Sequence, residues 1–473
     1  MKKLVTFNFM HVFIIITCLA LFIYQDGYSQ ITTSGISGKI IDKKGEPLPG
    51  VTVVAQSTST GANSNAVTGT DGRYNIINLS AGETYKVTAT MVGFDANEKS
   101  DIYLSLGVTT TLDLTMEEKN TQLNEVVVVG NKNTNSATTV KKDQLQQIPT
   151  IARSITDFTR LAPQSSNNSF AGANYRYNNV SIDGAINNDA IGFSPSLGGI
   201  SGTSNMPGSS TRTNPISLDA LQEVQAVISP FDIKLGNFTG GSVNAVSRSG
   251  SNEVTGSVYT YGTNASIIGP DNASGMGKMS SAYYDSQSGL RVGFPIVKNK
   301  LFFFVNGELD RKQQPVAYEV GQGAIISDTT AQHIIKVMEN MPASEYNPNG
   351  GFNPGSYENY SIKTSSDKIF ARLDYIINDK NRLMIRNNYN TSNCGNLDNA
   401  NNIFKFSGMD YTQHNNFNTT VAELRSTISK NLSNILIGGY TNIHDYRDPI
   451  GTIFPQIQIS NVNGGTVYLG TDR

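Results

Sequence analysis

The sequence predicts a mainly β protein with three parts: a small β-sandwich, an α+β domain, and part of a transmembrane antiparallel β-barrel. Three observations predict this fold class. Short strands alternate with turn dipeptides over residues 34–116, short amphipathic helices precede separate strands over residues 144–250, and apolar and polar side chains alternate from residue 254 onward. Alternation with a period of two gives each strand one apolar and one polar face.

The N-terminus has the layout of a secretory signal peptide. Lys2 and Lys3 form a positive start, residues 12–24 are apolar apart from Thr17, and polar and small residues follow. A membrane anchor is the alternative, but the apolar stretch is shorter than the ~20 residues that a helical span needs. We therefore expect residues 1–29 to be a signal peptide that is cleaved near Ser29.

Charge and cysteine content exclude several classes of protein. The formal net charge is −2 over 473 residues, which gives no electrostatic case for nucleic-acid binding. After removal of the leader, Cys394 is the one cysteine left, so no disulfide framework within the chain is expected. No later segment is an apolar run of helical-span length, so a membrane location requires a closed barrel.

Residues 34–116 are expected to form a small β-sandwich, because turns such as Asp71-Gly72 separate short strands at regular spacing. The runs 37–42, 47–53 and 70–74, together with Gly93-Phe94, resemble the carboxypeptidase regulatory-like domain. This resemblance implies a seven-stranded, transthyretin-like sandwich without catalysis.

An enzyme is not expected. A zinc peptidase needs a His/Glu ligand set, whereas His333, His414 and His444 stand in no HExxH pattern. The chain has no phosphate loop, no dinucleotide fingerprint and no CxxC pair. We expect no catalytic residue, no metal site and no cofactor.

Residues 117–143 have the composition of a polar tether around one hydrophobic strand. An isolated run of strong β-formers between polar flanks suits strand addition to the sheet edge of a partner; a last strand of the sandwich is the alternative. The stretch is similar to the TonB box of TonB-dependent outer-membrane receptors, and this similarity implies capture by a periplasmic TonB-type energy transducer. Its residues are Leu123, Asn124, Glu125, Val126, Val127, Val128 and Val129.

Residues 144–250 resemble the plug domain of the same receptors. Residues 145–158 favour one or two short helices with Ser154 as an N-cap, and residues 179–182 and 221–228 favour strands. The resemblance rests on an Asp-Gly turn after the first strand and on a glycine pair, strand and arginine in residues 240–250. The candidate motif residues are Asp183, Gly184, Gly240, Gly241, Asn244 and Arg248. Ordinary turn and strand chemistry is the alternative explanation for them.

Two further stretches, 175–185 and 228–232, resemble the Oar-like branch of the family. The arginine-glycine signature of SusC-like glycan importers is not evident in this region. The resemblance therefore does not imply a sugar substrate or a lipoprotein lid.

Residues 251–473 are expected to form part of an outer-membrane β-barrel. Alternation alone fits a soluble antiparallel sheet as well, but the connection lengths separate the two. Tight turns are expected at 297–300, 378–381 and 430–433, and long connections at 311–366 and 391–417. Short connections that alternate with long ones are typical of outer-membrane barrels, which have short periplasmic turns and longer outer loops.

The number of visible strands predicts an incomplete barrel. About eight strands follow residue 254, including one or two at 456–469, whereas plugged transporters have ~22 and a barrel of ~8 has no room for a plug. We therefore expect the sequence to be an N-terminal fragment whose wall ends in an unpaired strand edge.

These patterns predict TonB-dependent active transport across the bacterial outer membrane. The expected partners are a TonB-type transducer, outer-membrane lipid and an unknown extracellular substrate, but no nucleic acid. A structural or adhesive surface protein is the alternative, and dependence of activity on residues 126–129 separates the two. The sequence does not identify the substrate.

Overall fold

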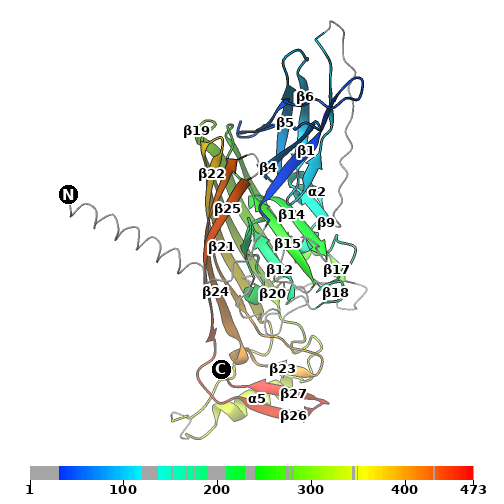
Figure 1. Ribbon diagram of the computed structural model, residues 1–473. Helices are drawn as coiled ribbons and strands as arrows, with labels where there is room; N and C mark the ends of the chain where they lie inside the picture. The colour runs from blue at the N-terminus through cyan, green and yellow to red at the C-terminus, as the bar shows by residue number, and fades with distance from the viewer. Residues whose placement is uncertain are drawn as a thin grey trace, which may run out of the picture.

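The computed structural model describes residues 31–471, apart from 120–136, 151–152, 167–168, 174–176, 189–208, 229–239, 272–276, 279–281, 344–346, 349 and 430–431. The expected signal peptide and the TonB-box-like strand at residues 123–129 lie outside the described residues. Figure 1 shows a sandwich at one end, a small sheet next to it, and a tall wall of long strands against which the small sheet lies.

The sandwich consists of two sheets that enclose an apolar core, as predicted. Ile36, Val53, Tyr85 and Val87 are completely buried between the sheets. One sheet holds β4 (Arg73–Ser80), β1 (Thr33–Asp42), β7 (Thr109–Thr111) and β8 (Leu114–Met116); the other holds β3 (Asn63–Val67), β2 (Thr52–Ser57), β5 (Glu83–Thr90) and β6 (Asn97–Leu104).

The last strand of the sandwich is interrupted in the middle. Both β7 and β8 pair in parallel with β1, and between them the Leu112 carbonyl accepts the Tyr74 hydroxyl at 2.7 Å. A Cβ on Gly38 would lie 1.9 Å from that carbonyl oxygen, so only glycine permits the close crossing. Counted as one interrupted strand, β7 and β8 complete the seven strands that the resemblance implies.

The second body is a mixed five-stranded sheet with short helices, which we call the plug sheet. Both predicted helices are present, and Leu145 and Phe158 bury their side chains beside Val224. β12 runs parallel to β15, and the other pairs are antiparallel. The strand order of the plug sheet is β13 (Ala185–Ile186), β12 (Asn179–Ile182), β15 (Gly241–Ser247), β14 (Leu221–Ile228) and β9 (Ala137–Lys141). Its helices are α2 (Lys142–Gln147), α3 (Ile155–Thr159), η2 (Ser209–Thr211) and η3 (Leu218–Ala220). Two further strands, β10 (Ser165–Ser166) and β11 (Ser169–Phe170), pair only with each other.

The third body, the wall, is a single antiparallel sheet in which each strand pairs with the next wall strand along the chain. Its strands are β16 (Thr255–Asn264), β19 (Tyr284–Val297), β20 (Leu301–Pro315), β21 (Ser361–Asn378), β22 (Asn381–Gly395), β24 (Tyr411–Ser429) and β25 (Leu432–Pro449). Within the described part of the chain, β16 and β25 do not pair with each other, so this sheet is open. Along the chain, the connection from β16 to β19 contains α4 (Ala265–Ile268) and a small strand pair, β17 (Pro270–Asp271) and β18 (Gly277–Lys278).

The wall has its short turns at the end that carries the sandwich. The turn after β19 contacts the sandwich through Asn299. Its Oδ1 is so close to Gly61 that a Cβ built on Gly61 would lie 2.6 Å from it. Beside the turn before β22, Arg382 donates to the Asn63 carbonyl at 3.1 Å. The long connections, 316–360 and 396–410, emerge at the opposite end. They are shorter than predicted because the strands continue beyond the apolar band.

One predicted feature of the wall is wrong. Residues 456–469 do not add barrel strands: β26 (Ile457–Val462) pairs with β27 (Gly465–Leu469), and β27 pairs with β23 (Ile403–Lys405), so the three strands form a separate sheet. That sheet packs with α5 (Asp328–Glu339) around Phe352, Phe404 and Phe454, while η4 (Ser407–Met409) lies beside it. An apolar core of their own therefore holds the two long connections and the segment after β25 together. Figure 1 shows these segments gathered at the far end of the wall.

The two faces of the wall differ in polarity. The outward face exposes large apolar side chains along neighbouring strands, whereas the inward face buries polar and charged groups against the plug sheet. No helix of the described residues is long and apolar enough to cross a membrane. The exposed apolar residues include Val258, Leu290, Leu309, Ile369 and Leu436.

Candidate functional site

The contact between the plug sheet and the wall is built around Asp183, which follows β12 in the predicted Asp-Gly turn. Its φ of 44° and that of Gly184, 70°, are left-handed values. The carboxylate accepts the Ser247 N–H at 2.8 Å and the Ser247 hydroxyl at 2.7 Å, which ties the turn to the end of β15. The turn therefore places a buried anion at the surface of the plug sheet that faces the wall.

Two wall arginines neutralise that anion. Arg386 of β22 lies 2.9 Å from Asp183 and also donates to the Ile182 carbonyl at 2.5 Å. Arg372 of β21 lies 3.6 Å from Asp183 and donates to the Ser247 carbonyl at 3.0 Å. Because both guanidinium groups come from the wall and the carboxylate comes from the plug sheet, one buried ion cluster joins the two bodies.

Arg248, the last residue of the predicted motif, belongs to a second ion cluster. Its Nε donates to the Leu221 carbonyl at 2.9 Å, and its guanidinium lies 3.8 Å from Asp219. Asp219 in turn pairs with Arg291 of the wall at 2.9 Å. Burial, together with the nearby Arg291, lowers the pKa of Arg248 to about 10, and Asp219 opposes this shift.

A third cluster lies beside η3. Ser217 donates to the Glu308 carboxylate at 2.7 Å, and Tyr259 donates to the same group. Lys368 lies 2.9 Å from Glu308 and also pairs with Asp310. The alternation in the sequence predicted one polar face for the wall strands, but it did not predict that Glu308 and Asp310 on this face of β20 lie beside the plug sheet.

Neutral side chains of the wall hold the plug segment that precedes η3. Asn388 and Asn390 of β22 donate to the Pro215 and Asn214 carbonyls at 3.0 and 3.2 Å. The Thr211 hydroxyl lies 2.6 Å from that of Ser392. Hydrogen bonds of this kind can be exchanged for bonds to water at a small net free energy, which suits a contact that opens and closes.

The remaining motif residues lie inside the plug sheet. A Cβ on Gly240 would lie 2.9 Å from the Ala173 Cβ, and one on Gly241 would lie 2.9 Å from the Phe170 ring. Asn244 accepts the Ser181 hydroxyl at 2.7 Å across β15 and β12. The structure thus ties Asp183 to Ser247, the residue before Arg248, but leaves both glycines at the opposite end of β15.

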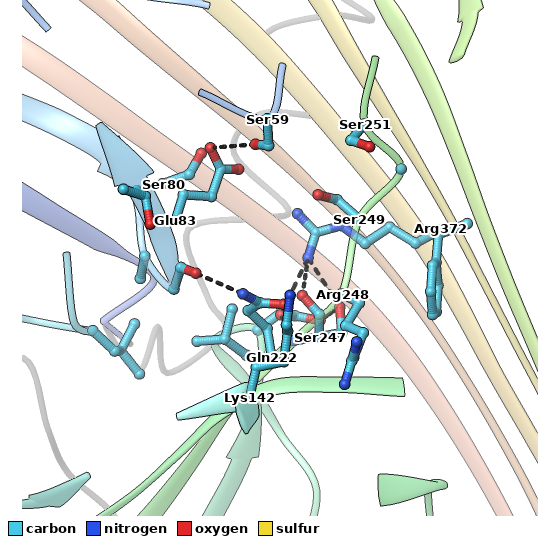
Figure 2. Close-up of a pocket in the computed structure, with 18 of the residues that line it drawn as sticks. Ser59, Ser80, Glu83, Lys142, Gln222, Ser247, Arg248, Ser249, Ser251 and Arg372 are labelled. Atoms are coloured by element: carbon cyan, nitrogen blue, oxygen red, sulfur yellow. Dashed lines mark hydrogen bonds and ion pairs between the residues drawn. The ribbon is translucent and has the colours of Figure 1, made fainter. Parts of the chain in front are cut away.

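A chamber of about 590 Å³ opens where the sandwich, the plug sheet and the wall meet. Figure 2 shows Ser80 and Glu83 of the sandwich, Gln222 and Ser247 of the plug sheet, and Arg372 of the wall around it. Its lining is rich in hydroxyl, amide and guanidinium groups. Among the described residues, no group of three His, Cys, Asp or Glu side chains could hold a metal ion.

Family comparisons match two parts of the chain. Residues 35–117 match the carboxypeptidase regulatory-like domain, and residues 246–471 match an outer membrane beta barrel domain. The chain is also 25% identical over 396 residues to the TonB-dependent transporter Oar of Myxococcus xanthus. That alignment covers 77% of the chain and 34% of the relative, so the chain spans about a third of the relative's length.

Solved structures also show similarity to the protein. The outer membrane transporter YddB from Escherichia coli matches with a TM-score of 0.47 and 14% identity, over 71% of this chain and 43% of that one. The siderophore receptor PirA from Acinetobacter baumannii matches with a TM-score of 0.42 and 16% identity, over 70% and 42%. From these matches, the chain combines a region that matches an outer membrane beta barrel domain with one that matches a carboxypeptidase regulatory-like domain, and it is similar in sequence to a TonB-dependent transporter.

Proposed function

We propose that the protein takes part in energy-coupled uptake of a solute across the outer membrane, and that the plug sheet is the movable part. The observation that carries this proposal is the nature of the contact between the plug sheet and the wall. Asp183, Arg372 and Arg386 join the two bodies through ion pairs, and wall amides hold the backbone of the segment before η3. Such contacts can re-form after each displacement.

The similarity to a TonB-dependent transporter supports a periplasmic TonB-type protein as the source of energy. The proposed point of capture is the hydrophobic strand at residues 123–129, which lies in the sequence between the sandwich and β9. Strand addition uses backbone hydrogen bonds, so it tolerates many side chains but needs a free N–H at each paired position.

Val127→Pro is the sharpest test of this coupling. Proline removes one backbone donor and fixes φ, so binding of a purified periplasmic TonB domain should fall about tenfold or more. The matched control is Thr134→Pro, which lies in the polar part of the same tether. Surface plasmon resonance measures the binding, and heat-modifiability on gels confirms that both variants insert normally. Equal binding by the two variants would place the capture point elsewhere.

An unbiased depletion experiment can identify the substrate. Cells that express the protein and cells that lack it are grown in a complex medium, and mass spectrometry follows which solutes are depleted. Depletion that is lost both in cells without the protein and in cells with the Val127→Pro variant supports transport. Normal depletion combined with a loss of surface attachment in the deletion strain would favour a structural or adhesive role instead.

A further inference from the structure

The sandwich is docked on the plug sheet through one buried carboxylate. Glu223 of β14 is fully buried, and both of its oxygens face the sandwich. One accepts the Tyr103 hydroxyl of β6 at 2.8 Å, and the other accepts the Leu106 N–H at 3.0 Å. Burial raises the pKa of the Glu223 carboxyl, and these two donors partly offset the shift.

Neighbouring residues of the plug sheet extend this contact. Gln225 donates to the Leu106 carbonyl at 3.1 Å. Gln222, which Figure 2 labels, donates to the Gly82 carbonyl at 2.7 Å. The ammonium of Lys141, at the end of the edge strand β9, lies 4.1 Å from the centre of the Tyr103 ring. The sandwich therefore covers the end of the plug sheet where β9 pairs with β14.

The apolar part of the contact is small. Ala81 and Leu106 of the sandwich pack against Val246 of the plug sheet, with Ile31 beside them. The wall adds polar contacts, in which Arg425 donates to the Thr32 carbonyl at 3.1 Å. Contacts between domains that are small and polar permit relative motion, whereas a permanent junction buries a large apolar surface.

The docked sandwich also closes one side of the chamber. Ser59, Ser80 and Glu83 come from the sandwich, and the other sides are formed by β14, β15 and the wall. If the sandwich moved away, the polar ends of β14 and β15 and the wall arginines would face solvent. The same movement would uncover β9, the first strand of the plug sheet.

We propose that the sandwich is a gate, latched on the plug sheet by Glu223, that must leave the plug sheet before the chamber opens and β9 can move. This inference rests on the proposed function, because it assigns the sandwich a step in the same transport cycle. The docked arrangement is the closed state.

The latch is tested without any substrate, by labelling a cysteine at the contact. Ala81→Cys places a thiol in the apolar seam, where Ala81 is 6% exposed. In cells, its reaction with a maleimide reports how often the sandwich is undocked. Glu223→Ala and Tyr103→Phe should each speed the reaction about tenfold, because each leaves a buried polar group of the latch without its partner.

Two controls accompany this experiment. Val87→Cys, in the core of the sandwich, should stay protected in every background, and Val92→Cys, which is 98% exposed, should react fully in all of them. Tyr103→Phe changes the sandwich alone, so it keeps the test valid if Glu223→Ala disturbs the plug sheet. If neither variant speeds labelling at position 81, Glu223 is not a latch and the proposal fails.

A reversible crosslink tests the gate during transport. A Cβ on Gly82 would lie 3.6 Å from the Gln222 Cβ, within the range of about 3.5–4.5 Å found in disulfides. The double variant Gly82→Cys, Gln222→Cys should join the sandwich to the plug sheet under oxidation. Uptake of the solutes found by the depletion experiment should stop when the bond forms and return with a reductant.

The single variants Gly82→Cys and Gln222→Cys, oxidised in the same way, are the matched controls, and oxidation should not change the uptake that each of them shows in the reduced state. Undiminished uptake by the crosslinked protein would overturn the gate while leaving transport intact. If no solute depends on the protein in any form, the proposed function fails, and the labelling experiment still decides whether Glu223 latches the sandwich.

Discussion

Asp183 shows what a single side chain contributes to the seating of the plug sheet. It holds its own turn through Ser247 and receives Arg372 and Arg386 from the wall. The residue was predictable from the Asp-Gly turn motif, but its two partners were not, because they lie about 190 and 200 residues further along the chain and share no pattern with it.

Asp183→Asn should loosen the plug sheet strongly. The substitution removes the negative charge between two buried guanidinium groups, and breaking a buried ion pair on one side typically costs about 3–5 kcal/mol. Proteolysis of the plug in detergent-solubilised protein, followed over a urea series, should show a lower midpoint. Asp71→Asn is the control, because its ion pair with Arg73 is exposed and contributes little. Equal midpoints for the two variants would contradict this role of Asp183.

At the scale of elements, β15 shows why the glycine pair is needed. Every residue of β15 is buried, since the strand has β12 on one side and β14 on the other and both its faces are covered. At its start the backbone passes against the Phe170 ring, where no Cβ fits. The glycine pair was predictable from the sequence, whereas its neighbour Phe170 comes from β11, whose two residues give no pattern.

Gly241→Ala should destabilise the plug sheet by about 1–3 kcal/mol, as expected for overpacking. The added methyl would lie 2.9 Å from the Phe170 ring and 3.0 Å from the Val227 carbonyl oxygen. Gly438→Ala on β25 is the matched control, because nothing lies within 4 Å of its added Cβ. The same proteolysis assay applies, and a loss of stability in the control as large as that in Gly241→Ala would refute the packing argument.

The wall strands show where alternation stops being informative. The pattern predicted a long connection that runs to residue 417, but β24 begins at Tyr411. Beyond the apolar band its outward residues are Thr412, His414 and Asn416, so the outward face is polar there and the alternation disappears, although the backbone pairing continues. Beyond the apolar band, the length of β24 was therefore determined by its pairing with β22 and β25 rather than by the local sequence.

At the scale of the whole molecule, the protein is an assembly of separate cores. The sandwich, the plug sheet and the connections at the far end of the wall each bury their own apolar cluster, although Phe304 and Phe370 of the wall join the cluster of the plug sheet. Polar contacts make up most of the junction between the sandwich and its neighbours. Such an arrangement lets one body move without unfolding another.

The sandwich should therefore fold alone. A fragment of residues 31–119 retains the whole core around Ile36, Tyr85 and Val87, and we expect one cooperative thermal transition by circular dichroism. Val87→Ala should lower the midpoint clearly, because it leaves a cavity in a filled core, whereas Val92→Ala at an exposed site should not. A fragment without a cooperative transition would mean that the sandwich needs the plug sheet to fold.

The sequence by itself determined the class of the protein: a sandwich, an α+β plug and a barrel wall, with their order and with the short turns at one end. These features are local, because alternation, turn dipeptides and glycine pairs depend on neighbours within a few residues. Only the tertiary structure decided which polar groups meet, such as Asp183 with Arg386 and Glu223 with Tyr103. It also decided that residues 457–469 leave the wall for a sheet of their own. The physical reason is the same in both cases. Partners from distant parts of the chain become neighbours only after the strands have paired, and the residues next to each partner in the sequence contain no pattern that predicts this pairing.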